Sequence, residues 1–210
     1  MFNKSISAQS CTAHPSRKLI LLIGFFSLLL SACSVTQEDG QPAAISNITP
    51  AHAEALADAV SSMKSGDFKN AQSLLLDLIN KQPNIANAHV NLGIIFIKNK
   101  SFDEAENSLN RALQIEPKNI YALNQLGFLY RRQGNFPKAK ASYEKAIDIN
   151  SDYAYAHLNL GILYDLYLYD LENAIEQYKM YIELSKDDTK QIEKWIFELE
   201  KRRKKPLAQK

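Results

Sequence analysis

The sequence predicts an all-α fold, a solenoid or superhelix of about four helix–turn–helix repeats followed by a C-terminal capping helix. The first observation is a set of residue columns that recur every 34 residues, a period typical of a repeat array. The second is that each period holds two apolar patterns at helical spacing, separated by a short polar turn. The third is the composition, since 7 glycines and 46% hydrophobic residues suit a helical protein rather than a disordered one. The columns are Leu92-Gly93, Leu126-Gly127 and Leu160-Gly161; Phe68, Phe102 and Phe136; Ala71, Ala105 and Ala139; Ala112 and Ala146; and Pro83 and Pro117.

The period over residues 86–119 shows how two helices arise from one repeat. Apolar residues at helical spacing predict a first helix over 86–98. The polar residues 99–101 interrupt the pattern, and a second apolar pattern starts at Phe102. Pro117 ends the second helix, because proline cannot extend a helix and disfavours helical backbone in the residue before it.

Small residues mark the places where the two helices must approach each other closely. Gly93 lies inside the predicted first helix, and Ala105 and Ala112 lie on the second. A glycine within a helix costs about 1 kcal/mol relative to alanine. Because this glycine recurs in three periods, we expect close packing to offset its cost.

The repeat resembles the tetratricopeptide repeat family, whose pattern places an aromatic residue, Leu-Gly and Tyr on the first helix, then Ala, Phe, Ala and Pro on the second. The resemblance covers residues 51–186 and implies repeats at about 52–85, 86–119, 120–153 and 154–186. This resemblance is specific for the fold and gives almost no information about the function. The matching residues are His89, Leu92, Gly93, Phe96, Ala105, Leu109, Ala112 and Pro117 in the second repeat, and Leu123, Leu126, Gly127, Tyr130, Ala139, Tyr143 and Ala146 in the third.

The first and fourth repeats depart from this pattern. The first has Asp58-Ala59 in place of the Leu-Gly pair, and terminal repeats are often atypical because their outer face meets water. The fourth gains one residue, which we expect within 167–170, between its two helices.

The period ends after Leu184, and residues 187–210 are expected to cap the array. A stripe of apolar residues at helical spacing predicts a capping helix over 188–203 that covers the open side of the last repeat. The basic run 201–205 suits a solvated helix C-terminus, where cations interact favourably with the helix dipole. Contact of this run with anionic lipid or with a partner is the alternative.

Residues 1–32 are predicted to be a secretory leader outside the repeat fold. The basic pair Arg17-Lys18 precedes an uncharged apolar run over 19–30, which is shorter than the about 20 helical residues that span a bilayer. The run ends in Leu30-Ser31-Ala32-Cys33, which resembles the lipobox of bacterial lipoproteins. The resemblance implies cleavage before Cys33 and lipidation of its thiol. An ordinary signal peptide with an incidental cysteine is the alternative.

The mature chain is therefore expected to be anchored to a membrane through Cys33. Cys11 would leave with the leader, so the mature chain could form no internal disulfide. The lipoprotein resemblance implies a thioether-linked diacylglycerol and an N-acyl chain of the palmitate type, and two or more chains anchor stably. Ser34 stands where an aspartate would resemble an inner-membrane retention signal, which favours the periplasmic face of the outer membrane. Residues 33–50 would then form a flexible tether.

The sequence shows no residue pattern typical of an enzyme: no nucleophile elbow, no zinc-protease motif, no glycine-rich phosphate loop and no paired-cysteine metal site. His89 and His157 share a repeat position that often holds a large aromatic residue in the family, so packing is favoured over metal binding. The net charge of +2 does not suggest nucleic acid. We therefore expect a protein without catalytic activity, cofactor, metal or nucleic-acid partner.

A concave face lined by the first helices is the expected binding surface, by resemblance to the family. Tyr121, Phe128 and Tyr155 are the most attractive candidates there, because aromatic residues and arginine dominate binding energy in small patches. Packing between repeats is the alternative for the apolar members. The lysine and asparagine set with which some family members bind chaperone C-termini is not reproduced. The expected groove residues are Asn87, Val90, Ile94, Ile97, Tyr121, Asn124, Phe128, Arg131, Tyr155, Leu158, Ile162 and Asp165, with Arg132 adjacent.

These features lead to the hypothesis of a lipid-anchored periplasmic scaffold that holds a partner protein near the outer membrane. Similar repeat lipoproteins include pilotins, which assist secretins of type IV pili or secretion systems, and adaptors for peptidoglycan hydrolases. We favour pilus or secretion assembly slightly. Self-association through the end of the array, with Trp195 in the interface, is a structural alternative.

Overall fold

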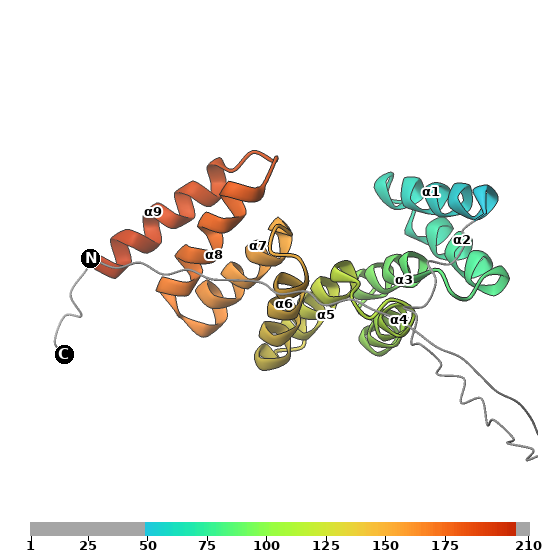
Figure 1. The fold of residues 1–210 in the computed structure, drawn as a ribbon, viewed down its shortest axis with the longest axis horizontal. Coiled ribbons are helices and arrows are strands. Elements are labelled where there is room, and N and C mark those ends of the chain that lie inside the picture. Colours follow the sequence, from blue (N-terminus) through green and yellow to red (C-terminus); the bar gives the residue numbers. More distant parts are fainter. Residues whose placement is uncertain (1–48, 205–210) are drawn as a thin grey trace, which may run out of the picture. The chain divides into compact units, whose positions relative to one another are not determined.

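A computed structural model describes residues 49–204, and over this range the chain is helical apart from short connections (Figure 1). The described residues form nine α-helices and one π-helical segment, without a strand, and belong to one compact unit. The prediction of an all-α superhelix with about four helix pairs and a C-terminal helix is confirmed. The elements are α1 (Pro50–Lys64), α2 (Phe68–Lys81), α3 (Ala86–Lys98), α4 (Phe102–Ile115), α5 (Ile120–Arg132), α6 (Phe136–Ile149), α7 (Ala154–Leu163), η1 (Tyr164–Leu168), α8 (Leu171–Leu184) and α9 (Lys190–Lys204).

Some of the predicted segments lie outside the described residues. These are the leader over 1–32, the lipidated Cys33, nearly all of the tether over 33–50, and the chain beyond residue 204. Helix α1 begins at Pro50, and α9 begins two residues after the start expected for the capping helix. No helix in the described range has the length and hydrophobicity that a membrane span requires.

The helices pack in pairs, α1 with α2, α3 with α4, α5 with α6, and α7 with α8. The second helix of each pair then packs on the first helix of the next, so that each repeat contacts its neighbours along the array. The buried side chains form clusters between successive repeats rather than a single central core. Helix α9 packs on α8 and contributes Ile192, Ile196 and Leu199 to the last of these clusters.

The same turn joins the two helices in each of the first three pairs. After α3, Lys100 adopts a left-handed conformation with φ of 62°, and the N–H of Ser101 donates to the carbonyl of Phe96 at 2.9 Å. This 6→1 bond defines a Schellman motif, which satisfies carbonyls at a helix C-terminus. Gly66 and Gly134 are the left-handed residues of the same turn in the first and third pairs, and Tyr169 is the left-handed residue between α7 and α8.

The additional residue of the fourth repeat extends its first helix instead of lengthening the turn. Residues Tyr164–Leu168 form the π-helical segment η1, and the N–H of Asp170 donates to the carbonyl of Tyr164 at 3.0 Å, one residue further than in the other turns. The ring of Tyr167 packs on Phe136 with centroids 4.9 Å apart. The expected position within 167–170 is therefore only partly right, because a π-turn absorbs the extra residue before the chain reverses.

In the second, third and fourth repeats, a glycine on the first helix faces a large side chain of the second helix. A Cβ at Gly93 would lie 2.7 Å from Leu109 Cγ, and a Cβ at Gly127 would lie 2.5 Å from Tyr143 Cε1. At Gly161 the nearest atom would be Tyr178 Cδ1, at 2.7 Å. These distances are shorter than real Cβ contacts allow, so the helices pair at this spacing only because the residue is glycine.

We predict that Gly127→Ala lowers the free energy of unfolding by about 1–2 kcal/mol. Overpacking costs about 1–3 kcal/mol, and we expect the upper part of this range, about 2–3 kcal/mol, because the added Cβ would lie 2.5 Å from the Tyr143 ring. The better helix propensity of alanine returns about 1 kcal/mol. Urea denaturation followed by circular dichroism measures the difference. The exposed Lys145→Ala on α6 serves as the control and should stay within about 0.5 kcal/mol of wild type. A Gly127→Ala variant as stable as wild type would contradict the role of this contact.

Candidate functional site

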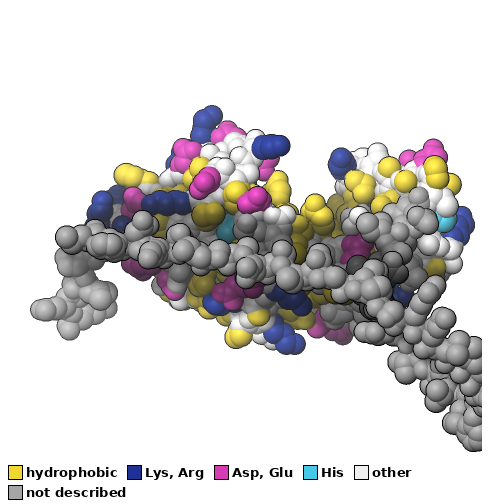
Figure 2. Space-filling model, viewed as in Figure 1, with side chains coloured by type: hydrophobic (Ala, Val, Ile, Leu, Met, Phe, Trp, Pro, Cys, Tyr) yellow, Lys and Arg dark blue, Asp and Glu magenta, His cyan; other side chains and the backbone are white. Residues whose placement is uncertain are grey.

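The first helices of successive repeats lie side by side and form a groove. Helix α3 packs on α5, and α5 on α7. Between α1, α3 and α5 their side chains enclose a groove of about 260 Å³, which we call the α1–α5 groove. Figure 2 shows hydrophobic side chains gathered in the hollow between the α1–α2 end and the α8–α9 end of the array. The α1–α5 groove is lined by Leu56, Val60, Asn87, Val90, Asn91, Ile94, Tyr121 and Gln125.

The α1–α5 groove is apolar with amide groups, and none of its lining residues is charged. It brings together four of the predicted residues, Asn87, Val90, Ile94 and Tyr121. Val90 is only 5% exposed, whereas Asn87 is exposed and Tyr121 is 54% exposed. Apolar walls with a few hydrogen-bonding groups are typical of sites that take an uncharged segment.

A row of four tyrosines continues from the α1–α5 groove across α5, α7 and α8. The rings of Tyr121 and Tyr153 meet edge to face with centroids 5.4 Å apart, and Tyr155 follows at 6.3 Å from Tyr153. Tyr181 lies 6.2 Å beyond Tyr155. Tyr155 is 49% exposed and its hydroxyl donates to the Asp187 carboxylate at 2.7 Å, so its ring is held in a fixed position at the surface.

Two tyrosines of this row, Tyr153 and Tyr155, stay protonated at neutral pH. Burial raises the pKa of Tyr153 to about 12. The hydrogen bond to Asp187 raises the pKa of Tyr155, with a smaller contribution from burial. Tyr153 and Tyr155 therefore present neutral hydroxyl groups beside their aromatic faces.

Asn124 was predicted in the groove, but the structure buries it beneath the surface. Its side chain is 4% exposed and accepts a hydrogen bond from Asn159 Nδ2 at 3.0 Å. Its own amide donates to the hydroxyl of Tyr153 at 3.5 Å. Asn124 thus connects α5 to α7 and supports the tyrosine row instead of facing a ligand.

The predicted arginines lie beside the ring of Phe128 on α5. The guanidinium carbon of Arg131 is 5.1 Å from the ring centroid, and that of Arg132 is 6.0 Å away. Arg131 is half-buried and Arg132 is exposed. The charge of Arg131 also acts on the buried hydroxyl of Tyr143, where it opposes the rise in pKa that burial causes. This part of the face combines positive charge with an aromatic ring.

Two of the predicted residues of the last repeat, Ile162 and Asp165, face a different space, which is closed by α9. Ile162 and Asp165 line a pocket of about 410 Å³ together with Trp195 of the C-terminal helix. Arg202 of α9 pairs with Asp165 at 3.6 Å across it. Leu158 is half-buried and packs against the last core cluster, and Ile97 of the second repeat is buried. Only part of the predicted set therefore lies in the α1–α5 groove, the pocket closed by α9 or the tyrosine row.

Sequence reasoning missed half of the residues in the α1–α5 groove. Leu56 and Val60 lie one 34-residue period before Val90 and Ile94, so the repeat register applied to α1 would have identified them. Asn91, Gln125 and Asn159 form an amide column at the same period, at a repeat position next to those carried over from the family.

The two buried histidines have a structural role in the turns between repeats. His89 Nε2 lies 2.9 Å from the carbonyl of Pro83, and His157 Nε2 lies 2.9 Å from the carbonyl of Ser151. Burial lowers the pKa of His89, so its ring is neutral at neutral pH. Among residues 49–204, no three His, Cys, Asp or Glu side chains are placed to hold a metal ion.

Comparison with solved structures shows the same fold in other repeat proteins. TTC0263, a thermophilic TPR protein of Thermus thermophilus, is 21% identical with a TM-score of 0.62, over 73% of this chain and 83% of that one. MamA is 21% identical with a TM-score of 0.53, over 76% of this chain and 97% of that one. A mutant O-GlcNAc transferase of Thermobaculum terrenum is 21% identical with a TM-score of 0.58, over 62% of this chain but only 25% of that protein. At these identities the similarity concerns the fold alone.

Sequence comparison identifies the family. No curated protein matches the chain. Models of the tetratricopeptide repeat match residues 84–152 and residues 125–189, which together span just over half of the 210 residues. With the helix pairs described above, these matches establish that the chain belongs to the tetratricopeptide repeat family.

Proposed function

We propose that this protein is a non-enzymatic adaptor, anchored by lipid to the periplasmic face of the outer membrane, which holds an extended segment of a partner protein in the α1–α5 groove. Tetratricopeptide repeat domains are scaffolds suited to protein–protein interaction. The groove itself is the observation that carries the proposal, because it presents exposed binding groups on a rigid helical face. The lipobox at residues 30–33 supports the anchor.

The lining of the α1–α5 groove favours a particular kind of segment. Leu56, Val60 and Ile94 offer apolar surface to small hydrophobic side chains. Asn87, with the amides of Asn91 and Gln125, can exchange hydrogen bonds with the N–H and C=O groups of an extended backbone. Since no lining residue is charged, the segment that fits is apolar and uncharged, and the tyrosine row provides a continuation for aromatic contacts.

The pathway that we favour is assembly of a pilus or secretion complex, in which the partner is a secretin subunit. A peptidoglycan hydrolase as partner is the second candidate, and self-association is the third. Purification of the tagged protein from solubilised membranes, with mass spectrometry of what it retains, distinguishes the three. Recovery of neither a secretin nor a wall enzyme would contradict the first two.

The double substitution Asn87→Ala with Tyr121→Ala is predicted to weaken partner binding roughly thirtyfold, which corresponds to about 2 kcal/mol. Both side chains are exposed, so the fold should be retained. Binding to the co-purified partner is measured by titration calorimetry, and helicity by circular dichroism.

The control variant truncates one large apolar side chain and one amide side chain on the second helices, outside the groove. Leu76→Ala on α2 and Asn107→Ala on α4 truncate an exposed apolar and an exposed amide residue outside the groove. The control should bind as wild type does. If the groove variant and the control variant bind the partner equally well, the partner does not occupy the α1–α5 groove.

The anchor is tested by Cys33→Ser, which removes the thiol that would carry the lipid. We predict that this variant is left unprocessed or is released from the outer-membrane fraction, since a hydroxyl cannot form the thioether. Membrane fractionation with labelled palmitate measures both effects. A Cys33→Ser protein that fractionates with the outer membrane unchanged would refute the lipoprotein assignment.

A further inference from the structure

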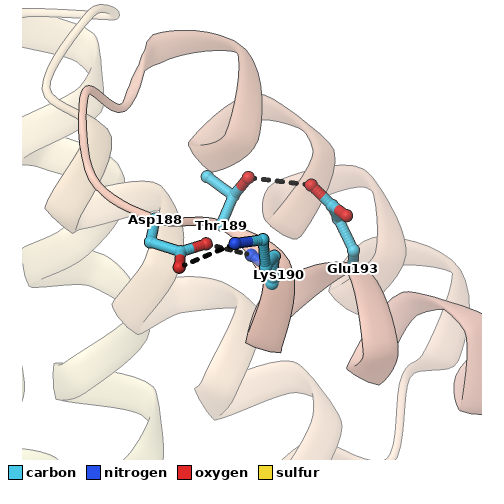
Figure 3. A network of polar contacts seen from close by, with 4 residues as sticks. All are labelled: Asp188, Thr189, Lys190 and Glu193. Carbon is cyan, nitrogen blue, oxygen red and sulfur yellow. Dashed lines mark hydrogen bonds and ion pairs between the residues drawn. The ribbon is translucent and has the colours of Figure 1, made fainter.

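Helix α9 has two opposite faces, and only one of them is used by the fold. Ile192, Ile196 and Leu199 form the buried face, which packs against the last repeat. The network in Figure 3 fixes the start of the helix, where Thr189 Oγ1 donates to Glu193 at 2.8 Å and the backbone N–H of Lys190 donates to Asp188 at 3.1 Å. The rotation of α9 about its own axis is thus set by both its packing and its cap.

The outward face carries a regular stripe of four lysines with a phenylalanine at its centre. The members recur at i, i+4, i+7, i+11 and i+14, which places them within about 80° of one another around the helix. All of them are exposed, and Phe197 is 65% exposed. Figure 2 shows lysine and arginine side chains at the α8–α9 end of the array, with acidic side chains among them. The stripe consists of Lys190, Lys194, Phe197, Lys201 and Lys204.

We propose that this lysine–phenylalanine stripe binds the surface of an anionic phospholipid membrane. Lysines attract anionic headgroups over a distance of about one Debye length. An aromatic ring between them can enter the interface between headgroups and acyl chains, where such rings are favoured. The apolar face of α9 is already buried against α8, so the contact is peripheral and depends on charge.

Acidic residues accompany the stripe, since Glu193 and Glu198 line the same surface hollow as Lys190, Lys194 and Phe197. Helix α9 as a whole still carries six basic residues against three acidic ones. Lys190 pairs with Asp188 at 3.5 Å and Lys201 with Glu198 at 4.0 Å, and all four of these side chains are well exposed. Lys194 and Lys204 form no ion pair with any other described residue. Exposed pairs of this kind contribute little and exchange readily for lipid phosphate.

A membrane surface fits the stripe better than a protein groove does. A helix seated in a protein groove uses apolar anchors at successive turns, whereas this face has one apolar side chain among four cations. The proposal is independent of Cys33, because the stripe belongs to the folded repeat unit. A failure of the lipid anchor would leave it intact, and the reverse also holds.

Sedimentation with vesicles tests the proposal, using residues 40–210, the compact unit that contains every described helix. We expect binding to vesicles of phosphatidylcholine mixed with phosphatidylglycerol at low salt, little binding to phosphatidylcholine alone, and release at high salt. Replacing all four lysines of the stripe by glutamine should reduce the partition coefficient at least tenfold, since each lysine contributes roughly a factor of five near an anionic surface. A control with the same charge change, K64Q/K69Q/K118Q/K145Q, alters exposed lysines elsewhere and should bind as wild type does.

Fluorescence reports on the ring at the centre of the stripe. Trp195 is the only tryptophan of the chain, so the double variant Trp195→Phe with Phe197→Trp places a single reporter in the stripe. The emission of this reporter should shift to shorter wavelength with phosphatidylglycerol vesicles and stay unchanged with phosphatidylcholine vesicles.

Two results would overturn the proposal. One is an equal loss of vesicle binding in the stripe variant and in the control variant K64Q/K69Q/K118Q/K145Q. The other is no binding of the unchanged protein to anionic vesicles at low salt. Dimerisation in solution that Phe197→Ala abolishes would assign the stripe to a second copy of the chain and overturn it as well.

Discussion

The close approach of the two helices in each repeat is the contact on which the rest of the structure depends. At Gly93, Gly127 and Gly161 a side chain of the partner helix occupies the space that a Cβ would need. Leu109 fills this space in the second repeat, and the nearly inaccessible Tyr143 and Tyr178 fill it in the third and fourth. With the pair held at this distance, the first helices of successive repeats contact one another, and the α1–α5 groove lies between them.

The tyrosines in this contact also connect the core to the binding face. The hydroxyl of Tyr178 donates to Asp165 at 3.4 Å, and Arg131 lies close enough to both tyrosines to oppose the rise in their pKa that burial causes. Arg131 Nη1, Tyr143 Oη and Asp165 Oδ1 are buried without a hydrogen-bond partner among the described residues. The third and fourth repeats therefore carry polar groups behind the face of their first helices, whereas the α1–α5 groove of the first three repeats is lined by uncharged residues.

Much of the fold followed from the sequence, because a repeat shows each constraint several times. The recurrence of Gly93 indicated close packing of the paired helices, and the helix ends at Lys98 and Phe102 matched the predicted turn. The π-helical turn did not follow, since an extra residue can be absorbed either in a helix or in a loop. The residues of the groove were predicted less well. Asn124 accepts a hydrogen bond from Asn159 instead of facing the groove, and Ile162 faces a pocket that α9 closes. Both effects depend on long-range contacts that the repeat pattern does not encode.

We infer that the partner binds to the face of the first helices and not to the outer face of the second helices. Photo-cross-linking in living cells tests it most directly, with a benzophenone amino acid placed at Tyr121 in the α1–α5 groove or at the exposed Asn107 on α4. We predict a discrete protein adduct from position 121 and none from position 107. An adduct from position 107 alone, or the same adduct from both positions, would contradict the claim.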